Sequence, residues 1–579
     1  MIPKFFTLIV LLITKLCIPQ SETNIDEAYP VLNTQITTTL NPADVHTPGN
    51  LSIAQWQEDL RFLQKTVHKE YAFLFVKTTK EAFDTKVEGL YRDIPNLEPH
   101  EIIVRMTGLI ASFKYGHTGI FLSQKSINFH SLPINLYEFK DDIYIQGVHK
   151  KYQNTLGAKV VKINGIPIQE ALDKIKPIVN AENAQYFKAY GINYLRNIEV
   201  LHAQGITKML QNEITLTLEK DGKTFTQSFT AMGDGEYVPT HKGYVHQNED
   251  WLDARDQSAT PLYLKHLDKI YYSEYLEDKK AIYVRHSRIR DEAKESTAAF
   301  YDRVFDEVED KEVEKLIIDL RLNGGGNNYL NKEVIKGIIE TKKINKTGKL
   351  FVIIGKRTFS ACQNLVNELD NYTNVIFVGE PTAENINFWG DNRPVTLPNT
   401  GINVSLSYLW WQDKPALENG EWIAPSLPVT MTFKEYASNQ DPVLEAALNF
   451  DVPDFKPKPM EYISSLFISG QVEKLAVELP RMIHDPNYAF CDFETELNKK
   501  GNLLLQSGRV PEIQASVQVF ASITQLFPNS ARSYRNLGEA YLKLGAMQNA
   551  ESSLQKAIAL DSDGKISKSA KELLAQITE

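Results

Sequence analysis

The sequence predicts a multidomain α/β protein, and three observations support this fold class. The chain has 579 residues, more than one hydrophobic core usually serves, so length alone suggests several domains. The hydrophobic pattern changes from helical spacing to β alternation, then to alternating strands and helices, and finally back to helical spacing. The composition, 42% hydrophobic and 23% charged, is that of an ordinary globular protein rather than a disordered one.

Residues 1–21 have the layout of an export signal, in which Lys4 precedes a short apolar run and small or polar residues follow it. The apolar run, residues 5–13, is too short to span a membrane. We therefore expect an exported protein, periplasmic or extracellular. Cys17 leaves open a second form, in which a lipid tethers the N-terminus to a membrane.

The charge balance argues against a nucleic-acid partner. The chain carries 63 basic and 73 acidic residues, for a net charge of -10, which provides no basic patch for a phosphate backbone. The histidines are scattered, and no set of His, Cys, Asp and Glu has the spacing of a metal site. The sequence thus indicates neither a metal nor a cofactor.

Residues 50–120 are predicted to form a small helical domain. Ser52 and Gln55 have the S-x-x-Q form of a capping box. Apolar residues at helical spacing then mark three helices, the last of which ends at Tyr115-Gly116-His117-Thr118. The apolar positions of the first helix are Trp56, Leu60, Leu63, Val67 and Tyr71.

Residues 128–235 change to a β pattern, and residues 260–450 change again. In the first segment Asp221-Gly222 lies between two alternating runs as a hairpin turn. In the second, apolar runs such as KLIIDLR, KLFVIIG and NVIFVG alternate with helical patterns. This alternation predicts βαβ crossovers and a largely parallel, buried sheet.

Residues 460–579 are predicted to form α-helical repeats. Seven small and large residues match the positions at which the two helices of a tetratricopeptide repeat pack closely. These residues are Tyr534, Leu537, Gly538, Tyr541, Ala550, Leu554 and Ala557. A degenerate copy around Gly501 and Gly508 precedes them. Two repeats are too few for a free-standing array, so we expect this segment to dock on the rest of the chain or on a protein partner.

A glycine turn follows the buried strand predicted at residues 316–320. Gly324-Gly325-Gly326 permit positive φ and close approach, so their N–H groups can turn inward as an anion-binding nest. Asn327-Asn328 do not make the G-K-S/T ending of a phosphate loop, which favours a nest for an oxyanion. A plain tight turn is the alternative.

Ser360 follows the next strand and opens a helix. Helix N–H groups stabilise negative charge there, and the Ala361 amide can join those of the glycine nest. A serine at this position is more often an N-cap than a nucleophile. The glycine nest and Ser360 each follow a strand and precede a helix. Because parallel strands place both turns at one edge of the sheet, this arrangement favours Ser360 as a nucleophile.

The motifs DLRLNGGG, TFSACQN, VGEPT with NFWGD, and GEWIAPSLPV with DPVLEAAL resemble the core of the tail-specific, C-terminal-processing serine peptidases. Upstream, GHT and LGAKVVKINGIPI resemble that family's helical cap and PDZ-like region. The likeness spans about residues 50–450. It implies a helical cap at 50–120, a PDZ-like β module at 128–235 and a crotonase-like α/β peptidase core at 260–450.

The resemblance implies Ser360 as nucleophile, with an oxyanion hole from the amides of Gly324 or Gly325 and of Ala361. Processing-type members carry a lysine base in the pattern G-x-x-T-x-G-K, where this sequence has Asn385 in place of the lysine. Because an amide cannot accept the serine proton, a Ser-Lys dyad at this position is excluded.

A second branch, similar to the tricorn core, uses a histidine before a threonine as base, and His117 matches that position, with Gly116 where the branch has serine. Imidazole suits a base at neutral pH. The branch also has a distant glutamate that completes a polar relay, for which Glu418 and Glu421 are the candidates. A purely structural His117, capping the preceding helix, is the alternative.

Other polar residues are expected to have structural roles. His286 ends a strand and is the main competitor as base, although a half-buried strand position is the simpler interpretation. Glu384 is expected to be an exposed turn carboxylate. Asp319 and Arg321 are expected to form an ion pair that holds the glycine turn. The stretch 408–411, YLWW, either lines an apolar specificity pocket or, the favoured interpretation, packs in the core.

These patterns lead to one functional hypothesis and one alternative. The hypothesis is an exported serine peptidase that cleaves peptides or C-terminal segments of unfolded proteins through an acyl-enzyme on Ser360, with His117 as base. The alternative is an inactive binding protein on the same fold, which holds a peptide or ligand while the repeats recruit an envelope partner. The replacement of the family lysine by Asn385 motivates the alternative.

Overall fold

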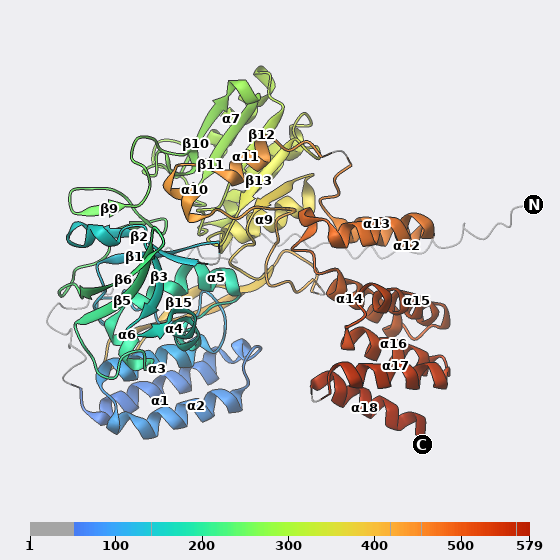
Figure 1. The fold of residues 1–579 in the computed structure, drawn as a ribbon, viewed down its shortest axis with the longest axis horizontal. Helices are drawn as coiled ribbons and strands as arrows, with labels where there is room; N and C mark the ends of the chain where they lie inside the picture. The colour runs from blue at the N-terminus through green and yellow to red at the C-terminus, as the bar shows by residue number, and fades with distance from the viewer. Residues whose placement is uncertain (1–50, 141, 417, 453, 563, 579) are drawn as a thin grey trace, which may run out of the picture. The chain divides into compact units, whose positions relative to one another are not determined.

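The structure is a computed structural model that describes residues 51–140, 142–416, 418–452, 454–562 and 564–578. Figure 1 shows the fold as a ribbon, coloured along the chain, with many of its helices and strands labelled. The export signal predicted at residues 1–21, with Cys17, lies outside the described residues. Within the part of the chain that is described, no helix is both long and apolar enough to cross a membrane.

The described part of the chain begins with a segment of three α-helices, α1 (Ile53–Glu70), α2 (Lys80–Asp93) and α3 (Pro99–Ala111). The predicted capping box is present at the start of α1, where Gln55 Oε1 accepts the Ser52 N–H at 2.9 Å and the Ser52 hydroxyl accepts the Gln55 N–H. The apolar positions predicted for the first helix are buried. Local periodicity and capping therefore account for this element.

A seven-stranded sheet follows, in which all the pairings are antiparallel. The predicted hairpin is confirmed: Asp221 and Gly222 both have positive φ, 51° and 72°, and join β5 to β6. The strands are β1 (Ile134–Phe139), β2 (Asp142–His149), β3 (Lys159–Ile163), β4 (Ile166–Pro167), β5 (Glu213–Lys220), β6 (Lys223–Thr230) and β9 (Trp251–Asp253). Helices α4 (Ile168–Ile175), α5 (Ala184–Tyr190) and α6 (Ile198–Ala203) lie between β4 and β5.

The helical segment and this β module share a single hydrophobic core, although their sequence patterns suggest two separate domains. Side chains of α1–α3 and of β1–β6 belong to the same buried cluster, and Val404 and Leu406 from much later in the chain join it. The sheet also extends past residue 235, because β9 pairs with β2. The loop that follows α3 is thus held against the β module rather than projecting from a separate domain.

The second sheet has six strands in the order β10-β11-β12-β13-β14-β17. Strands β11 to β17 are parallel, as the alternating pattern predicts, while β10 pairs antiparallel with β11 at the edge. The strands are β10 (Tyr271–Leu276), β11 (Ala281–His286), β12 (Lys315–Asp319), β13 (Leu350–Ile354), β14 (Ile376–Gly379) and β17 (Leu427–Pro428). The chain is therefore a mixed α/β protein.

Helices cover both faces of this sheet. The first face is covered by α7 (Thr297–Asp310), α8 (Asn331–Glu340) and α9 (Ala361–Tyr372). The opposite face packs on α11 (Pro442–Leu448) and on the start of the C-terminal helices; α10 (Phe433–Ala437) precedes α11.

The ion pair expected at the end of β12 is confirmed. Arg321 lies 2.8 Å from Asp319 and makes a two-pronged contact with Asp441 at 2.9 and 3.0 Å. It therefore ties the strand that leads into the glycine turn to the N-terminus of α11.

A long hairpin, β15 (Asn387–Thr396) and β16 (Asn403–Gln412), follows β14. The expectation that the stretch 408–411 packs in the core was wrong for two of its residues, because Leu409 and Trp410 are 40% and 42% exposed. The reason is that β16 pairs only with β15, and these two consecutive residues point to opposite faces of the two-stranded ribbon, so both faces are partly exposed there. Trp410 packs there on Trp389, with ring centroids 5.4 Å apart.

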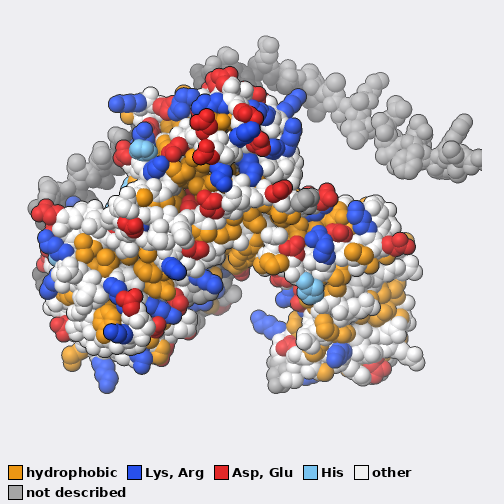
Figure 2. Space-filling model, turned by 45° about the horizontal axis from the view of Figure 1, so that its top comes forward, with side chains coloured by type: hydrophobic (Ala, Val, Ile, Leu, Met, Phe, Trp, Pro, Cys, Tyr) orange, Lys and Arg blue, Asp and Glu red, His pale blue; other side chains and the backbone are white. Residues whose placement is uncertain are grey.

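The C-terminal segment is helical, as predicted. Gly501 faces the Phe520 ring and Gly538 faces Leu554, so closely that a Cβ at either glycine would lie 2.5 or 2.6 Å from the facing side chain. Apolar side chains lie on the surface of the C-terminal helices (Figure 2). Ile468, for example, is 83% exposed. The helices are α12 (Pro459–Ile468), α13 (Val472–His484), α14 (Phe493–Gln506), α15 (Val510–Leu526), α16 (Ala531–Lys543), α17 (Met547–Leu560) and α18 (Lys565–Thr578).

Candidate active site

Ser360 lies in the tight turn between β13 and α9, at the N-cap position of the helix. Its side chain makes no capping hydrogen bond. The hydroxyl therefore does not cap the helix, which was the alternative to a nucleophile. The backbone has φ 59° and ψ -133°, a conformation that costs energy for a residue with a side chain. A serine held on a strained strand-to-helix turn presents its hydroxyl away from the sheet, as a nucleophile requires.

His117 is the side chain in contact with that hydroxyl. Its Nε2 lies 2.9 Å from Ser360 Oγ, although the two residues are 243 positions apart in the sequence. The imidazole stacks on Phe359, with ring centroids 4.6 Å apart and an interplanar angle of 20°, and is nearly parallel to the Phe388 ring, whose centroid is 6.1 Å away. These two rings limit the rotation of the imidazole.

The loop that carries His117 is fixed on both sides of the histidine. The Gly116 carbonyl accepts hydrogen bonds from Asn180 at 2.7 Å and from the Tyr186 hydroxyl at 3.1 Å. The Thr118 hydroxyl donates to Ser407 in β16 and accepts the backbone N–H of the same residue. The position of His117 therefore depends on both the β module and the β15-β16 hairpin.

Glu384 is the carboxylate beside His117, and the expectation that it is an exposed turn residue was wrong. Its side chain is completely buried, one oxygen accepts the backbone N–H of Ser360, and Oε1 lies 3.0 Å from His117 Nδ1. The relay position assigned to Glu418 or Glu421 is thus taken by Glu384, since both of those residues are exposed. The turn is buried because its backbone bonds inward, for example from the Ala383 N–H to the Thr358 carbonyl.

The contact between His117 and Glu384 is close but poorly directed. His117 Nδ1 and Glu384 Oε1 are both buried without a well-aligned hydrogen bond, despite their 3.0 Å separation. Hydrogen bonds of this kind often tighten only when substrate is bound. When Nδ1–H is directed at the carboxylate, Nε2 is left as the acceptor for the Ser360 proton.

Burial and charge set the protonation of this group. Burial opposes a charged imidazole, but the Glu384 carboxylate outweighs it, so that the pKa of His117 is raised above its ordinary value of 6.5. Burial also raises the pKa of Glu384, against the lowering effect of His117. Each member of the pair therefore favours the charged form of the other.

The glycine turn lies directly against Ser360. Gly325 has φ 94°, and a Cβ there would lie 2.5 Å from Ser360 Cβ and 2.9 Å from Ala361 N, so only glycine fits. Its N–H donates to Asn323 Oδ1 at 2.9 Å and is therefore already engaged, which corrects its expected role as an oxyanion donor. Gly324 and Ala361 are the expected donors that remain.

The competing bases are held in other roles. His286 is buried with Nδ1 3.1 Å from the Tyr301 hydroxyl, and burial lowers its pKa to about 4. Asn385 is half-buried, and its backbone N–H donates to Glu182 Oε2 at 3.2 Å. Within the described residues, no group of three or more His, Cys, Asp or Glu side chains is arranged to hold a metal.

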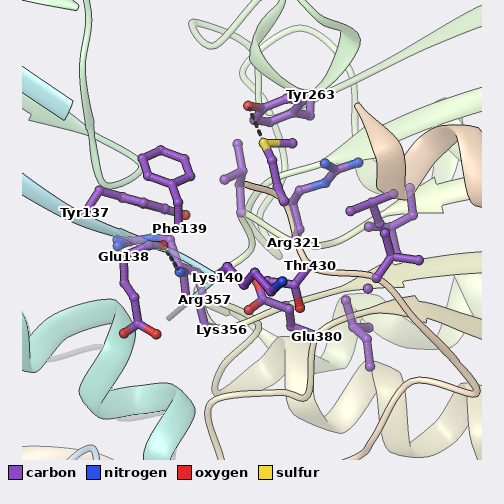
Figure 3. Close-up of a pocket in the computed structure, with 18 of the residues that line it drawn as sticks. Tyr137, Glu138, Phe139, Lys140, Tyr263, Arg321, Lys356, Arg357, Glu380 and Thr430 are labelled. Carbon is purple, nitrogen blue, oxygen red and sulfur yellow. Dashed lines mark hydrogen bonds between the residues drawn. The ribbon is translucent and has the colours of Figure 1, made fainter. Parts of the chain in front are cut away.

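Lys356, four residues before Ser360, is a further candidate base that the structure argues against. It borders a small cavity of about 50 Å³, where its ammonium donates to the Glu138 carbonyl and lies 4.5 Å from the centre of the Tyr137 ring (Figure 3). Burial opposes its charge, but Tyr137 and Glu380 raise its pKa above the ordinary value. A lysine that stays charged cannot accept a proton from serine.

Comparisons with known proteins show what this chain is similar to. None of the curated proteins matches the chain. Among solved structures, mature CPAF is similar at 12% identity over 68% of this chain and 96% of its own, with a TM-score of 0.48. The photosystem II D1 C-terminal processing protease is similar at 12% identity over 65% and 93%, with a TM-score of 0.33. The tricorn protease is similar at 12% identity over 69% and 36%, with a TM-score of 0.32.

The family model described as Peptidase family S41 matches residues 280–428. That segment runs from β11 to β17 and contains the glycine turn, Ser360 and Glu384. S41 peptidases are serine hydrolases. The part of the α/β core from β11 to β17 is therefore similar to peptidase family S41.

Proposed function

We propose that the chain is an active serine peptidase, which cleaves peptides or the C-terminal segments of unfolded proteins through an acyl-enzyme on Ser360. The observation that carries the proposal is the 2.9 Å distance between His117 Nε2 and Ser360 Oγ, within the reach that a general base needs. In this proposal Glu384 orients the imidazole.

The chemistry follows from the positions of these atoms. His117 takes the proton of Ser360 as Oγ attacks the substrate carbonyl, and later gives it to the leaving amine. Glu384 holds the proton-bearing Nδ1 toward itself and stabilises the imidazolium that forms. The amides of Gly324 and Ala361, with the N-terminus of α9, face the oxygen that becomes negative. Water then hydrolyses the acyl-enzyme by the same proton transfers in reverse.

The rest of the chain is assigned to substrate and partner binding in the same proposal. Strand β6 (Lys223–Thr230) is at the end of the strand order β1-β2-β3-β5-β6, so a PDZ-like module has an edge where an extended peptide can add as a strand. The C-terminal helices, as tetratricopeptide-like repeats, have exposed apolar residues such as Ile468, Val472 and Val477 for a protein partner. Residues 1–21 would direct the protein out of the cytoplasm.

The test is labelling of the purified protein with a fluorophosphonate probe between about pH 5 and 9. We expect the wild type to be labelled, and both Ser360→Ala and His117→Ala to lose labelling. Ser296→Ala is the matched control, because Ser296 is also an N-cap serine, but its hydroxyl accepts the Ala299 N–H and has a purely structural role. A folded wild type that is not labelled would refute the peptidase and support the inactive binding protein.

A further inference from the structure

Glu182 links the two loops that carry His117 and Glu384. It lies just before α5, and its side chain is 9% exposed. Its Oε1 accepts the backbone N–H of Gly116 at 3.0 Å, and its Oε2 accepts the backbone N–H of Asn385 at 3.2 Å. These amides belong to the residue immediately before His117 and the residue immediately after Glu384, so one carboxylate spans both loops.

This link bears on the least well-defined contact of the site. The separation of 3.0 Å between His117 and Glu384 is short, but its direction is poor, so small displacements of either loop decide whether the imidazole is correctly oriented. Partners in a second layer commonly change activity by about 10- to 100-fold through such orientation. We propose that Glu182 is a positioning residue, whose carboxylate fixes the His117 loop against the Glu384 loop. The inference rests on the proposed peptidase function.

The charge of Glu182 faces both the site and a cavity. The cavity, of about 740 Å³, is lined by Lys77, Lys114, Glu182 and Glu421 among others. Lys77 donates to the Lys114 carbonyl at 2.9 Å and lies 4.5 Å from the centre of the Tyr115 ring. The titratable and charged side chains that influence Glu182 or are influenced by it are Lys77, Tyr115, His117, Tyr186 and Glu384.

The two carboxylates act on His117 in the same direction. Burial and then repulsion by Glu384 raise the pKa of Glu182, while Lys77 and the two backbone N–H groups lower it. The charge of Glu182, like those of Glu384 and Asp391, raises the pKa of His117. Removing the Glu182 charge is therefore expected to lower the pKa of His117. A shorter side chain that keeps the charge is not expected to lower it.

Three variants separate these effects. Glu182→Gln removes the charge and replaces one accepting oxygen by an NH2 group, which cannot accept an N–H. Glu182→Asp keeps the charge but shortens the link. Asp173→Asn is the matched control, since Asp173 lines the same cavity and contacts Gln169 on its own helix. The measurements are kcat and KM on a peptide that the wild type cleaves, thermal unfolding, and an NMR titration of the His117 ring, assigned with His117→Ala.

We expect both Glu182 variants to lower kcat by about 10-fold or more at the pH optimum with little change in KM. Glu182→Gln alone should also lower the pKa of His117 in the titration, and Asp173→Asn should match the wild type in both measurements. The inference is overturned if Glu182→Gln and Glu182→Asp keep wild-type kcat, or if Asp173→Asn loses as much as they do. If one Glu182 variant does not fold, the kcat of the other variant, compared with that of Asp173→Asn, decides whether the inference holds.

The NMR arm keeps this inference distinct from the proposed function. If the wild type cleaves no peptide and takes up no probe, the peptidase proposal fails. The titration of His117 in the wild type, Glu182→Gln and Asp173→Asn is then still informative, because a pKa that falls only in Glu182→Gln supports the link to His117 and an unchanged one refutes it.

Discussion

The carboxylate of Glu384 accepts the backbone N–H of Ser360 with one oxygen and lies 3.0 Å from His117 with the other. It therefore supports the strained backbone of the nucleophile and the ring of its base at the same time. The serine is held at φ 59° by a group that also fixes the direction of proton transfer. Both functions depend on burial of a charge that is stable only because it is paired.

The first prediction concerns this carboxylate. Glu384→Gln should reduce kcat/KM, or the rate of fluorophosphonate labelling, by about 10²- to 10⁴-fold, because the imidazole loses both its orientation and the charge that stabilises its protonated form. The control is Glu418→Gln at an exposed position, which should retain the wild-type rate. If Glu384→Gln reacts as fast as the wild type, the orienting role of Glu384 is wrong.

Most of the fold could be predicted because capping residues, turn residues and hydrophobic periodicity act over a few neighbouring positions of the sequence. The capping box at Ser52, the hairpin turn at Asp221-Gly222 and the parallel strands of the α/β core are all present in the structure. Strand β10 was not predicted, since its sequence, YYSEYL, has half-buried polar residues at the sheet edge. The shared core of α1–α3 and the β module was also missed, because periodicity identifies an apolar face but not its partner.

Only part of the site was predicted, because a motif identifies a residue but not the distant side chains that pack around it. Motifs identified Ser360 and His117, which the structure brings together, but Glu384 was interpreted as an exposed turn because glutamate is rarely buried. A usable signal was present: Glu384 comes five residues after β14 ends at Gly379, at the same carboxyl edge of the sheet as Ser360. The structural role of Gly116 depends on rings from two distant segments and has no sequence signal.

The second prediction is the pH dependence of the reaction. His117 accepts the Ser360 proton only when its ring is neutral, and the Glu384 carboxylate raises the pKa of that ring above 6.5. The rate of labelling should therefore be low in acid and rise with pH, with a midpoint above 6.5. In Glu384→Gln, the residual rate should rise at a lower pH. Rates measured in a series of buffers at constant ionic strength check this, and a wild-type midpoint below 6.5 would contradict it.

The third prediction concerns Gly116. A Cβ at this position would lie 2.7 Å from the Phe359 ring and 2.8 Å from the Tyr186 ring, and Phe359 stacks on His117. Gly116→Ala should therefore lower the free energy of unfolding by about 1–3 kcal/mol and reduce labelling, because the rings must move.

The control for Gly116 is Gly89→Ala. Gly89 lies within α2, and a Cβ there meets no atom within 4 Å. This substitution should leave labelling unchanged and stabilise the helix by up to about 1 kcal/mol. Thermal unfolding of the two variants side by side gives the comparison, and equal unfolding temperatures would show that the rings around Gly116 yield without cost.

The fourth prediction links His286 to acid stability. Burial lowers the pKa of His286 to about 4 in the folded chain, against about 6.5 when unfolded. Between these two values the unfolded chain binds a proton that the folded chain does not. The stability is thus fully present above about pH 6.5 and falls by about 1.4 kcal/mol per pH unit below it, to a total loss of about 3 kcal/mol near pH 4.

The test is urea unfolding of the wild type, His286→Asn and His266→Gln at several pH values from about 7 to 4. Asparagine at position 286 does not titrate but can still bond to the Tyr301 hydroxyl, which lies 3.1 Å from His286 Nδ1. Its loss of stability on acidification should be smaller than that of the wild type by about the same 3 kcal/mol, because one proton uptake is removed from the unfolding reaction. His266 is exposed, so its replacement should leave the wild-type pH dependence unchanged. Parallel pH profiles for His286→Asn and the wild type would show that His286 takes up its proton without unfolding the core, and would remove burial as the reason for its lowered pKa.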